Sequence, residues 1–348
     1  KLSDRFSINC LTITDKAITI SRHRRGIYIM LVDAPDWATR HNYHHHSNPR
    51  SKDRAKTIYE KCHVRPQINA AWNTIKSKDA TDHERITARD VITRLSDNRS
   101  NSAMEAGKAV QLATDLHLVP DQFDTTLSLQ EATETAVRAL RQYTPQDYND
   151  TVRENDTARK DKYLDELPLV IENAVAGLTE AMRQENRILG EIDLIDCLPG
   201  NAVPHLTKPD YARAGDLKTK WSKMSSRAKS GWQAGSLPRS LTGMFDMNNI
   251  YQVAGFWALN GHRPPWLLYA NATDYRLFDQ NNTPELRDDY LHDVVADIAG
   301  NHKVTENILR AAKDKEELLG LVSPDWRAIY WNEPPTYLAE AKKMWGVQ

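Results

Sequence analysis

The apolar residues of this chain change their spacing between residues 164 and 278, and this change limits the possible folds most. Seven of them recur at steps of three and four, the spacing of one face of a helix: Leu164, Leu167, Ile171, Ala174, Val175, Leu178 and Met182. Beyond them, short strands are expected over 189–198, 211–221, 266–270 and 275–278, with a helix over 248–259 between the two pairs. This order predicts an α/β core with large helical additions.

Helices are expected on both sides of this core. Ser128-Leu-Gln-Glu131 is a capping box that begins a helix, and Pro145 lies past its end. Pro168 falls near the start of the amphipathic helix, where the first turn tolerates proline. Residues 145–163 before this helix are polar and charged, and they are expected to form a solvated connector. Thr283-Pro284 begins the last group of helices, expected through about 299, over 304–320 and near 336–345.

The domain organisation follows from the same patterns. Residues 1–50 contain two expected strands, 17–21 and 26–32, and are interpreted as an N-terminal extension or small β element. Residues 51–348 are expected to form the main domain, with a helical insertion at about 116–187 and a helical C-terminal region at about 283–348. The histidines between His41 and His46 lie in a polar stretch and are expected to be exposed.

Composition excludes several classes of protein. The formal net charge is −1, so a histone-like binder with a global basic field is excluded, although a local basic groove is not. Three cysteines are too few for a disulfide framework or for the four thiolates of an iron–sulfur cluster. No apolar run approaches the roughly 20 residues of a membrane-spanning helix, and no signal peptide is recognisable. A cytoplasmic protein is therefore expected.

Two acidic segments suggest a catalytic site: Gly190-Glu-Ile-Asp-Leu-Ile-Asp196 and Gly215-Asp-Leu-Lys-Thr-Lys220. Because alternate side chains of a strand share a face, Asp216 and Lys218 are expected to point the same way. A hairpin between the two segments would bring Asp193 beside Asp216. Two clustered carboxylates favour a hard cation such as Mg²⁺, and a lysine can orient the attacking water in phosphodiester hydrolysis.

These segments resemble motifs II and III of the PD-(D/E)xK nuclease superfamily, in its RecB-like and lambda-exonuclease-like branch. Three further segments resemble this family in the same order: 51–66, Gly107 to Asp115, and Tyr251-Gln-Val-Ala-Gly-Phe256. Gln111 stands where the family's helical motif I usually has histidine, and Phe256 where its later helix motif has tyrosine. The resemblance covers about residues 51–280 and implies a restriction-endonuclease-like αβββαβ core with a mixed central sheet.

The resemblance also implies roles for individual residues. Asp193 and Asp216 would bind the metal, the backbone carbonyl of Leu217 would complete its shell, and Asp115 would assist from the motif I helix. Lys218 would position the attacking water, and Gln252 would hold the active-site strand or the DNA backbone. The implied cofactor is Mg²⁺, for which Mn²⁺ can substitute, and no iron–sulfur cluster is expected. Cys62, near a cluster cysteine of some relatives, is then expected to pack as a small buried apolar residue.

Basic and aromatic residues follow the second acidic segment and suit contacts to phosphates and unpaired bases. A mobile loop is expected over 222–243. The candidate DNA contacts, at the end of the strand and in this loop, are Lys220, Trp221, Lys223, Arg227, Lys229, Trp232 and Arg239. The alternative interpretation is a solvated loop with core tryptophans. Glu191 shares a face with Asp193 and is either a supporting acid or a solvent-facing residue.

The sequence therefore predicts a Mg²⁺-dependent DNA nuclease, with an exonuclease of recombination, repair or DNA degradation, such as phages encode, as the leading interpretation. Two alternatives remain open: a structure- or sequence-specific endonuclease of the same fold, and a non-catalytic DNA-binding or assembly protein. DNA is the expected partner, and a single-strand annealing or other recombination protein is the protein partner that such a role implies. A ring-shaped oligomer and a monomer are both compatible with the sequence.

Overall fold

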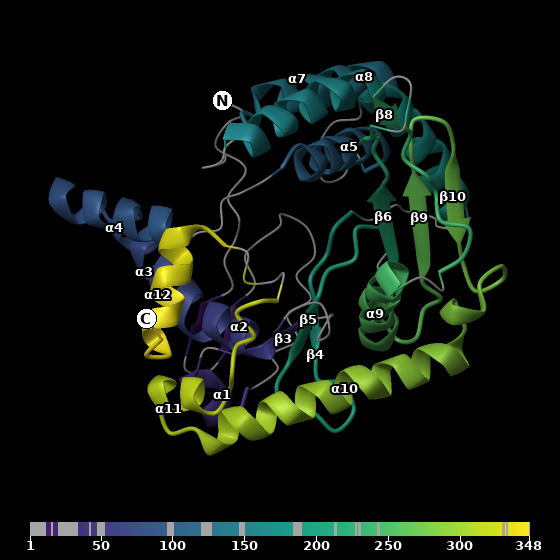
Figure 1. Cartoon of the computed structure of the whole chain (residues 1–348). Coiled ribbons are helices and arrows are strands. Elements are labelled where there is room, and N and C mark those ends of the chain that lie inside the picture. Colours follow the sequence, from purple (N-terminus) through teal and green to yellow (C-terminus); the bar gives the residue numbers. More distant parts are fainter. Residues whose placement is uncertain are drawn as a thin grey trace. The chain divides into compact units, whose positions relative to one another are not determined.

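A computed structural model shows a mixed α/β chain (Figure 1). The residues it describes are 12–14, 17–19, 34–41, 43–46, 53–95, 101–119, 127–145, 150–183, 190–211, 214–226, 228, 231–241, 244–328, 331 and 333–347. Contacts divide the chain into two compact units. Unit 1 comprises Lys1–Asn98, Ile195–Leu206 and Ala296–Gln348, and unit 2 comprises Arg99–Leu194 and Thr207–Val295. None of the described helices is long and apolar enough to cross a membrane.

Unit 2 contains a three-stranded sheet with the strand order β10-β9-β6. Its elements are α5 (Ser102–Leu118), α7 (Leu129–Gln142), α8 (Asp150–Ala181), β6 (Gly215–Thr219), β7 (Lys223–Met224), β8 (Trp232–Gln233), α9 (Met244–Leu259), β9 (Trp266–Ala270), β10 (Tyr275–Phe278) and the 3₁₀-helix η2 (Pro284–Leu286). Strand β9 pairs antiparallel with β10 and parallel with β6. The predicted strands 266–270 and 275–278 and the helix that ends at 259 are confirmed.

Helices cover both faces of this sheet. Leu217 of β6 and its register partner Leu268 of β9 pack with Leu178 and Met182 of the α8 region. On the opposite face, Asn249 of α9 donates a hydrogen bond of 2.7 Å to the Tyr269 hydroxyl group. Because side chains alternate along a strand, Asp216 and Lys218 lie on the α9 face.

The edge of the sheet at Gly215 has no room for a side chain. Gly215 is the register partner of Trp266, and a Cβ atom at position 215 would lie 1.9 Å from the Trp266 ring. The indole therefore packs directly on the glycine backbone. This close approach fixes the start of β6, and with it the position of the adjacent Asp216.

Helix α8 begins earlier than predicted. It starts at Asp150, so the expected solvated connector 145–163 is wrong from that residue onward, and Pro168 lies inside the helix. Tertiary contacts outweigh the local polar composition there. The Asp156 carboxylate accepts from the Ser102 backbone N–H at 3.0 Å and from the Tyr143 hydroxyl group at 3.0 Å, and Tyr163 is buried. The predicted capping box of α7, by contrast, is confirmed.

Most of the described residues of unit 1 are helical. Its elements are β1 (Thr12–Thr14), β2 (Ala17–Thr19), α1 (Asp36–Arg40), β3 (His45–His46), α2 (Arg54–Tyr59), the π-helix η1 (Glu60–Val64), α3 (Arg65–Lys76), α4 (Asp82–Leu95), β4 (Leu194–Asp196), β5 (His205–Thr207), α10 (Asp288–Ala311), α11 (Lys315–Gly320) and α12 (Pro335–Met344). The unit boundaries fall within β4, β5 and α10. The expected break near 300 is absent, because α10 is continuous. The expected strand at 26–32 lies outside the described residues.

The predicted hairpin between 189–198 and 211–221 is wrong. Strand β4 belongs to a sheet of order β3-β5-β4, whereas β6 pairs with β9. The physical reason lies in the connecting segment, which contributes its own strand, β5, beside β4. Strand β9, whose five residues are all buried, takes the place next to β6.

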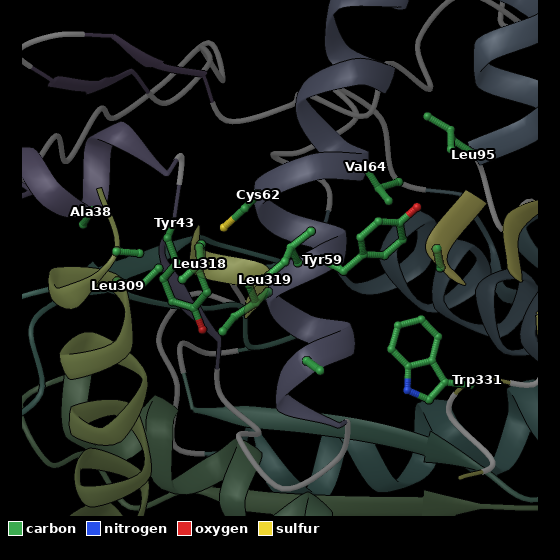
Figure 2. Close-up of a cluster of buried hydrophobic side chains, with 14 of the residues drawn as sticks. Ala38, Tyr43, Tyr59, Cys62, Val64, Leu95, Leu309, Leu318, Leu319 and Trp331 are labelled. Carbon is green, nitrogen blue, oxygen red and sulfur yellow. The ribbon is translucent and has the colours of Figure 1, made fainter. Parts of the chain in front are cut away.

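A cluster of buried aliphatic and aromatic side chains forms the core of unit 1 (Figure 2). Tyr59, Cys62 and Trp331 are each no more than 2% exposed within it. The prediction that Cys62 packs as a buried apolar residue is confirmed, and burial raises the pKa of its thiol to about 12. The expectation of exposed histidines is wrong: His41 is 0% exposed and His45 is 1% exposed, because β3 runs parallel to β5 inside this unit.

The contact between Gly215 and Trp266 gives a stability prediction. Gly215→Ala is expected to lower the free energy of unfolding by about 1–3 kcal/mol, because the methyl group has no space beside the indole ring. The measurement is urea denaturation followed by circular dichroism. Gly300→Ala is the control: a Cβ atom there meets nothing within 4 Å, and alanine in a helix interior is expected to stabilise the protein slightly. Equal effects of the two substitutions would contradict the prediction.

Candidate active site

Three side chains of unit 2 form a closed polar triangle on the α9 face of the sheet. Asp216 Oδ2 and Lys218 Nζ, two residues apart on β6, form an ion pair of 2.7 Å. Gln252 of α9 donates from Nε2 to Asp216 Oδ1 at 3.0 Å and accepts from Lys218 Nζ at its Oε1 at 3.1 Å. One amide group therefore fixes the orientation of both the acid and the amine.

Asp216 is buried, with 1% of its surface exposed. A buried carboxylate is stable only when charges or hydrogen bonds compensate the water it has lost. Lys218 supplies the charge. Burial lowers the pKa of Lys218, but the Asp216 charge and hydrogen bond outweigh it, so the net pKa is raised and the amine stays protonated at neutral pH.

A second acid next to Asp216 is Asp210. Its Oδ2 atom accepts a hydrogen bond of 3.0 Å from the Leu217 backbone N–H, and its own backbone N–H donates to the Gly215 carbonyl at 2.9 Å. Burial first, and the negative charge of Asp216 second, raise the pKa of Asp210 to about 8. The turn before β6 thus places two carboxyl groups close enough to influence each other's charge.

Asp210 was not among the predicted site residues, because the residues between the two expected strands were interpreted only as the turn of a hairpin. One signal was available: Pro209-Asp210 stands six residues before Asp216, and the superfamily's name itself denotes a Pro-Asp pair followed by an acid, one residue and a lysine. The hydrogen bond from Leu217 to Asp210 could not be read from the sequence, since it depends on the path of the turn.

Asp115 lies in a hydrogen-bonded group that begins on α5. The Tyr211 hydroxyl group donates to Asp115 Oδ1 at 2.7 Å, and its oxygen lies 2.6 Å from Thr114 Oγ1. Burial raises the pKa of Asp115 to about 7, against the hydrogen bond from Tyr211, which lowers it. Tyr211 directly follows Asp210 in the chain, so this group connects α5 to the turn that carries the second acid. Metal binding by Asp115 stays a prediction.

Asp193 is exposed and precedes β4, outside any strand. Without the predicted hairpin, strand pairing no longer places it beside Asp216. Glu191 is the residue of that segment whose charge acts on Asp210 and Asp115, and its Oε1 atom pairs with Lys208 Nζ at 2.7 Å. The metal-binding role of Asp193 therefore stays a prediction that has lost its geometric argument.

The segment after β6 is anchored at several points. Strands β7 and β8 pair antiparallel, and Asn271 Nδ2 donates to the Gly235 carbonyl at 2.7 Å. Arg276 Nη1 donates to the Pro238 carbonyl at 2.6 Å. The expected mobile loop over 222–243 thus contains a short pair of strands and these anchoring contacts among its described residues, and its mobility stays a prediction. Within it, Lys223 and Arg239 are exposed and Trp232 is half-buried.

Not every candidate DNA contact is accessible. Trp221 is 6% exposed and packs against Tyr163 with ring centroids 5.0 Å apart, so stacking of this indole on a base is excluded in this arrangement. Core packing, the alternative interpretation, holds for this residue. The Lys220 amine lies 5.0 Å from the centroid of the Tyr269 ring. Arg227 and Lys229 lie outside the described residues.

The donor set can be tested against the chemistry of Mg²⁺. No group of three or more histidine, cysteine, aspartate or glutamate side chains among the described residues could hold a metal ion. Mg²⁺, however, needs only one or two protein carboxylates and keeps several waters. Asp216 Oδ2 is buried and is paired with the Lys218 amine at 2.7 Å. The pair Asp210 and Asp216 thus meets the minimum for Mg²⁺, and a site of three or more acids is not formed there.

Comparison with known proteins gives no match, whether to family models, to curated proteins or to solved structures.

The Tyr211 hydrogen bonds give a second stability prediction. Tyr211→Phe leaves the buried Asp115 carboxyl group and Thr114 without this partner, and is expected to lower the free energy of unfolding by about 1–3 kcal/mol in urea denaturation. Tyr275→Phe is the matched control, because its hydroxyl group also donates to a carboxylate at 2.7 Å, that of Glu180, but in an exposed position. A similar, small effect of both substitutions would show that the Asp115 contact does not stabilise unit 2.

Proposed function

We propose that this chain is a Mg²⁺-dependent DNA nuclease whose reaction centre is Asp216, Lys218 and Asp210. The observation that carries the proposal is the buried Asp216 on β6, paired at 2.7 Å with Lys218 on the same strand face. A chance Asp-x-Lys sequence on a strand is most often solvated, whereas this one is buried and held by a glutamine from α9. The resemblance to PD-(D/E)xK nucleases at the same residues supports the same function.

The acids and the amine suit the charges that develop in phosphodiester hydrolysis. Asp216 and Asp210 would hold the cation, which polarises a phosphoryl oxygen and lowers the pKa of a bound water. Lys218 keeps its proton at neutral pH, so it can orient the attacking oxygen and balance negative charge on the phosphate. Gln252 contacts both Asp216 and Lys218 and keeps their geometry fixed.

The exposed cations after β6 support a nucleic acid as the substrate. Lys223 and Arg239 are exposed in the segment that directly follows the catalytic strand. Such side chains contact phosphates mainly through charge, and their binding weakens with added salt. The chain carries no net positive charge overall, so this local placement is what favours DNA binding.

Removal of the acid or the amine tests the proposal. Asp216→Asn and Lys218→Met are each expected to slow Mg²⁺-dependent cleavage of linear DNA by about 10²–10³-fold, the loss typical of one removed charged group at a reaction centre. Binding of DNA, measured by mobility shift in EDTA, is expected to persist. Asp165→Asn, an exposed acid on α8, is the control and should cleave at the wild-type rate.

If the wild-type chain shows no metal-dependent cleavage but binds DNA, the catalytic proposal is wrong and a non-catalytic DNA-binding protein is supported. If cleavage occurs and Asp216→Asn leaves its rate unchanged, the reaction centre is assigned to the wrong residues.

The choice between exonuclease and endonuclease is tested with a second substrate. We propose an exonuclease, because the motifs resemble those of RecB-like and lambda-exonuclease-like enzymes. The wild-type chain is then expected to degrade linear duplex DNA in Mg²⁺ or Mn²⁺ and to leave covalently closed circles intact. Conversion of closed circles to linear or nicked forms at a comparable rate would instead support the endonuclease.

A further inference from the structure

Unit 1 contains a group of buried imidazole rings that the proposed nuclease site does not use. His45 of β3 and His205 of β5 are register partners in a parallel pair of strands, and they are 1% and 0% exposed. His302 of α10 is 2% exposed. Its ring stacks on that of His45, with centroids 3.8 Å apart and an angle of 3° between the planes, and lies 5.1 Å from that of His205.

The histidine group connects segments that are far apart in the sequence. Besides the stacked rings, Glu306 of α10 contacts β3 and the segment before β5. Its Oε1 atom lies 3.4 Å from His45 Nε2 and accepts from the Ala202 and Val203 backbone N–H groups at 2.8 and 2.9 Å. The rings therefore lie where β3, β5 and α10 meet. A change of charge at this point would act on all three.

The surroundings of the His205 ring suit the uncharged state. Neither ring nitrogen of His205 has a hydrogen-bond partner, and both are buried. A proton added there would create a buried charge without an acceptor, which is costly. Two cationic rings stacked at 3.8 Å would also repel each other. The nitrogens do not converge on a shared point, since no described group of three such side chains could hold a metal ion.

The charged and titratable groups around the histidines are mostly unable to compensate a proton. They come from β3 and the residues before it, from η1, from α3 and from α10: Tyr43, His44, Lys61, Arg65, His302, Lys303 and Glu306. Lys61 and Arg65 oppose further positive charge. Glu306 is the acid among them, and its Oε1 atom already accepts from two backbone N–H groups and lies beside His45.

We propose that unit 1 contains an acid-sensitive device, in which the uncharged imidazoles of His45, His205 and His302 hold β3, β5 and α10 together and protonation separates them. The device does not depend on the nuclease function, because its residues lie in unit 1 and the reaction centre lies in unit 2.

The direction of the pH dependence follows from burial. Desolvation lowers the pKa of His45 to about 4 and that of His205 to about 3, against 6.5 in the unfolded chain. The stability that these groups contribute is complete above pH 6.5 and is lost as the pH falls from 6.5 towards 4. Asp115 and Asp210 of unit 2 have raised pKa values, so the stability that they contribute is lost as the pH rises, the opposite of the histidines. The measurement must therefore report on unit 1 alone.

Hydrogen exchange followed by mass spectrometry on the full chain provides this local measurement. Between pH 7 and pH 5, corrected for intrinsic exchange rates, the protection of peptides that cover 43–46, 203–206 and 299–306 is expected to fall by roughly 20-fold for each imidazole. His205→Leu, which replaces a ring without hydrogen-bond partners by an apolar side chain of similar size, is expected to reduce this fall by roughly 20-fold. His83→Leu, an exposed histidine of α4, should behave as wild type.

A second measurement covers the case in which His205→Leu does not fold. In the wild-type chain labelled with ¹³C at histidine Cε1, the His205 and His45 resonances are expected to stay in the neutral form down to about pH 5 and to become protonated only as exchange protection of unit 1 is lost. The proposal is overturned if these rings titrate near pH 6.5 with protection intact. It is also overturned if His205→Leu folds and shows the same fall in protection as wild type.

Discussion

The ion pair between Asp216 and Lys218 is the interaction on which the candidate site depends. A carboxylate that is 1% exposed is tolerated only because an amine on the same strand face and an amide from α9 compensate it. Removal of the Lys218 amine would leave a buried charge unpaired. The parallel pairing of β6 with β9 and the packing of Trp266 on Gly215 set the strand that carries both residues.

The two units use buried polar groups in different ways. In unit 2 the buried Asp216 carboxylate group is paired with the Lys218 amine and accepts a hydrogen bond from the Gln252 amide. In unit 1 both ring nitrogens of His205 are buried without a hydrogen-bond partner, so this ring is suited to the neutral form. The first arrangement concentrates charge where a cation and a phosphate could bind, and the second makes a packed core sensitive to protons.

Local patterns predicted what depends on local forces. The alternation of β6 placed Asp216 and Lys218 on one face, and the apolar run Trp266–Ala270 marked a buried strand. Gln252 was identified from its motif, and the structure brings it to both residues. The features that were not predicted depend on distant contacts. Strand β4 pairs with β5 and not with β6, so strand pairing does not place Asp193 beside Asp216, and the turn before β6 supplies another acid, Asp210. Trp221 looked accessible because its packing against Tyr163 of α8 is not a local property.

Anomalous diffraction from a crystal soaked with Mn²⁺ tests the central claim most directly. We expect a peak in unit 2 at about 2.1 Å from carboxylate oxygens of both Asp216 and Asp210. The same map would show whether Asp115, Asp193 or Glu191 joins them. A well-ordered, Mn²⁺-soaked site with no peak near Asp216, or with the ion bound elsewhere, would contradict the assignment of this strand as the reaction centre.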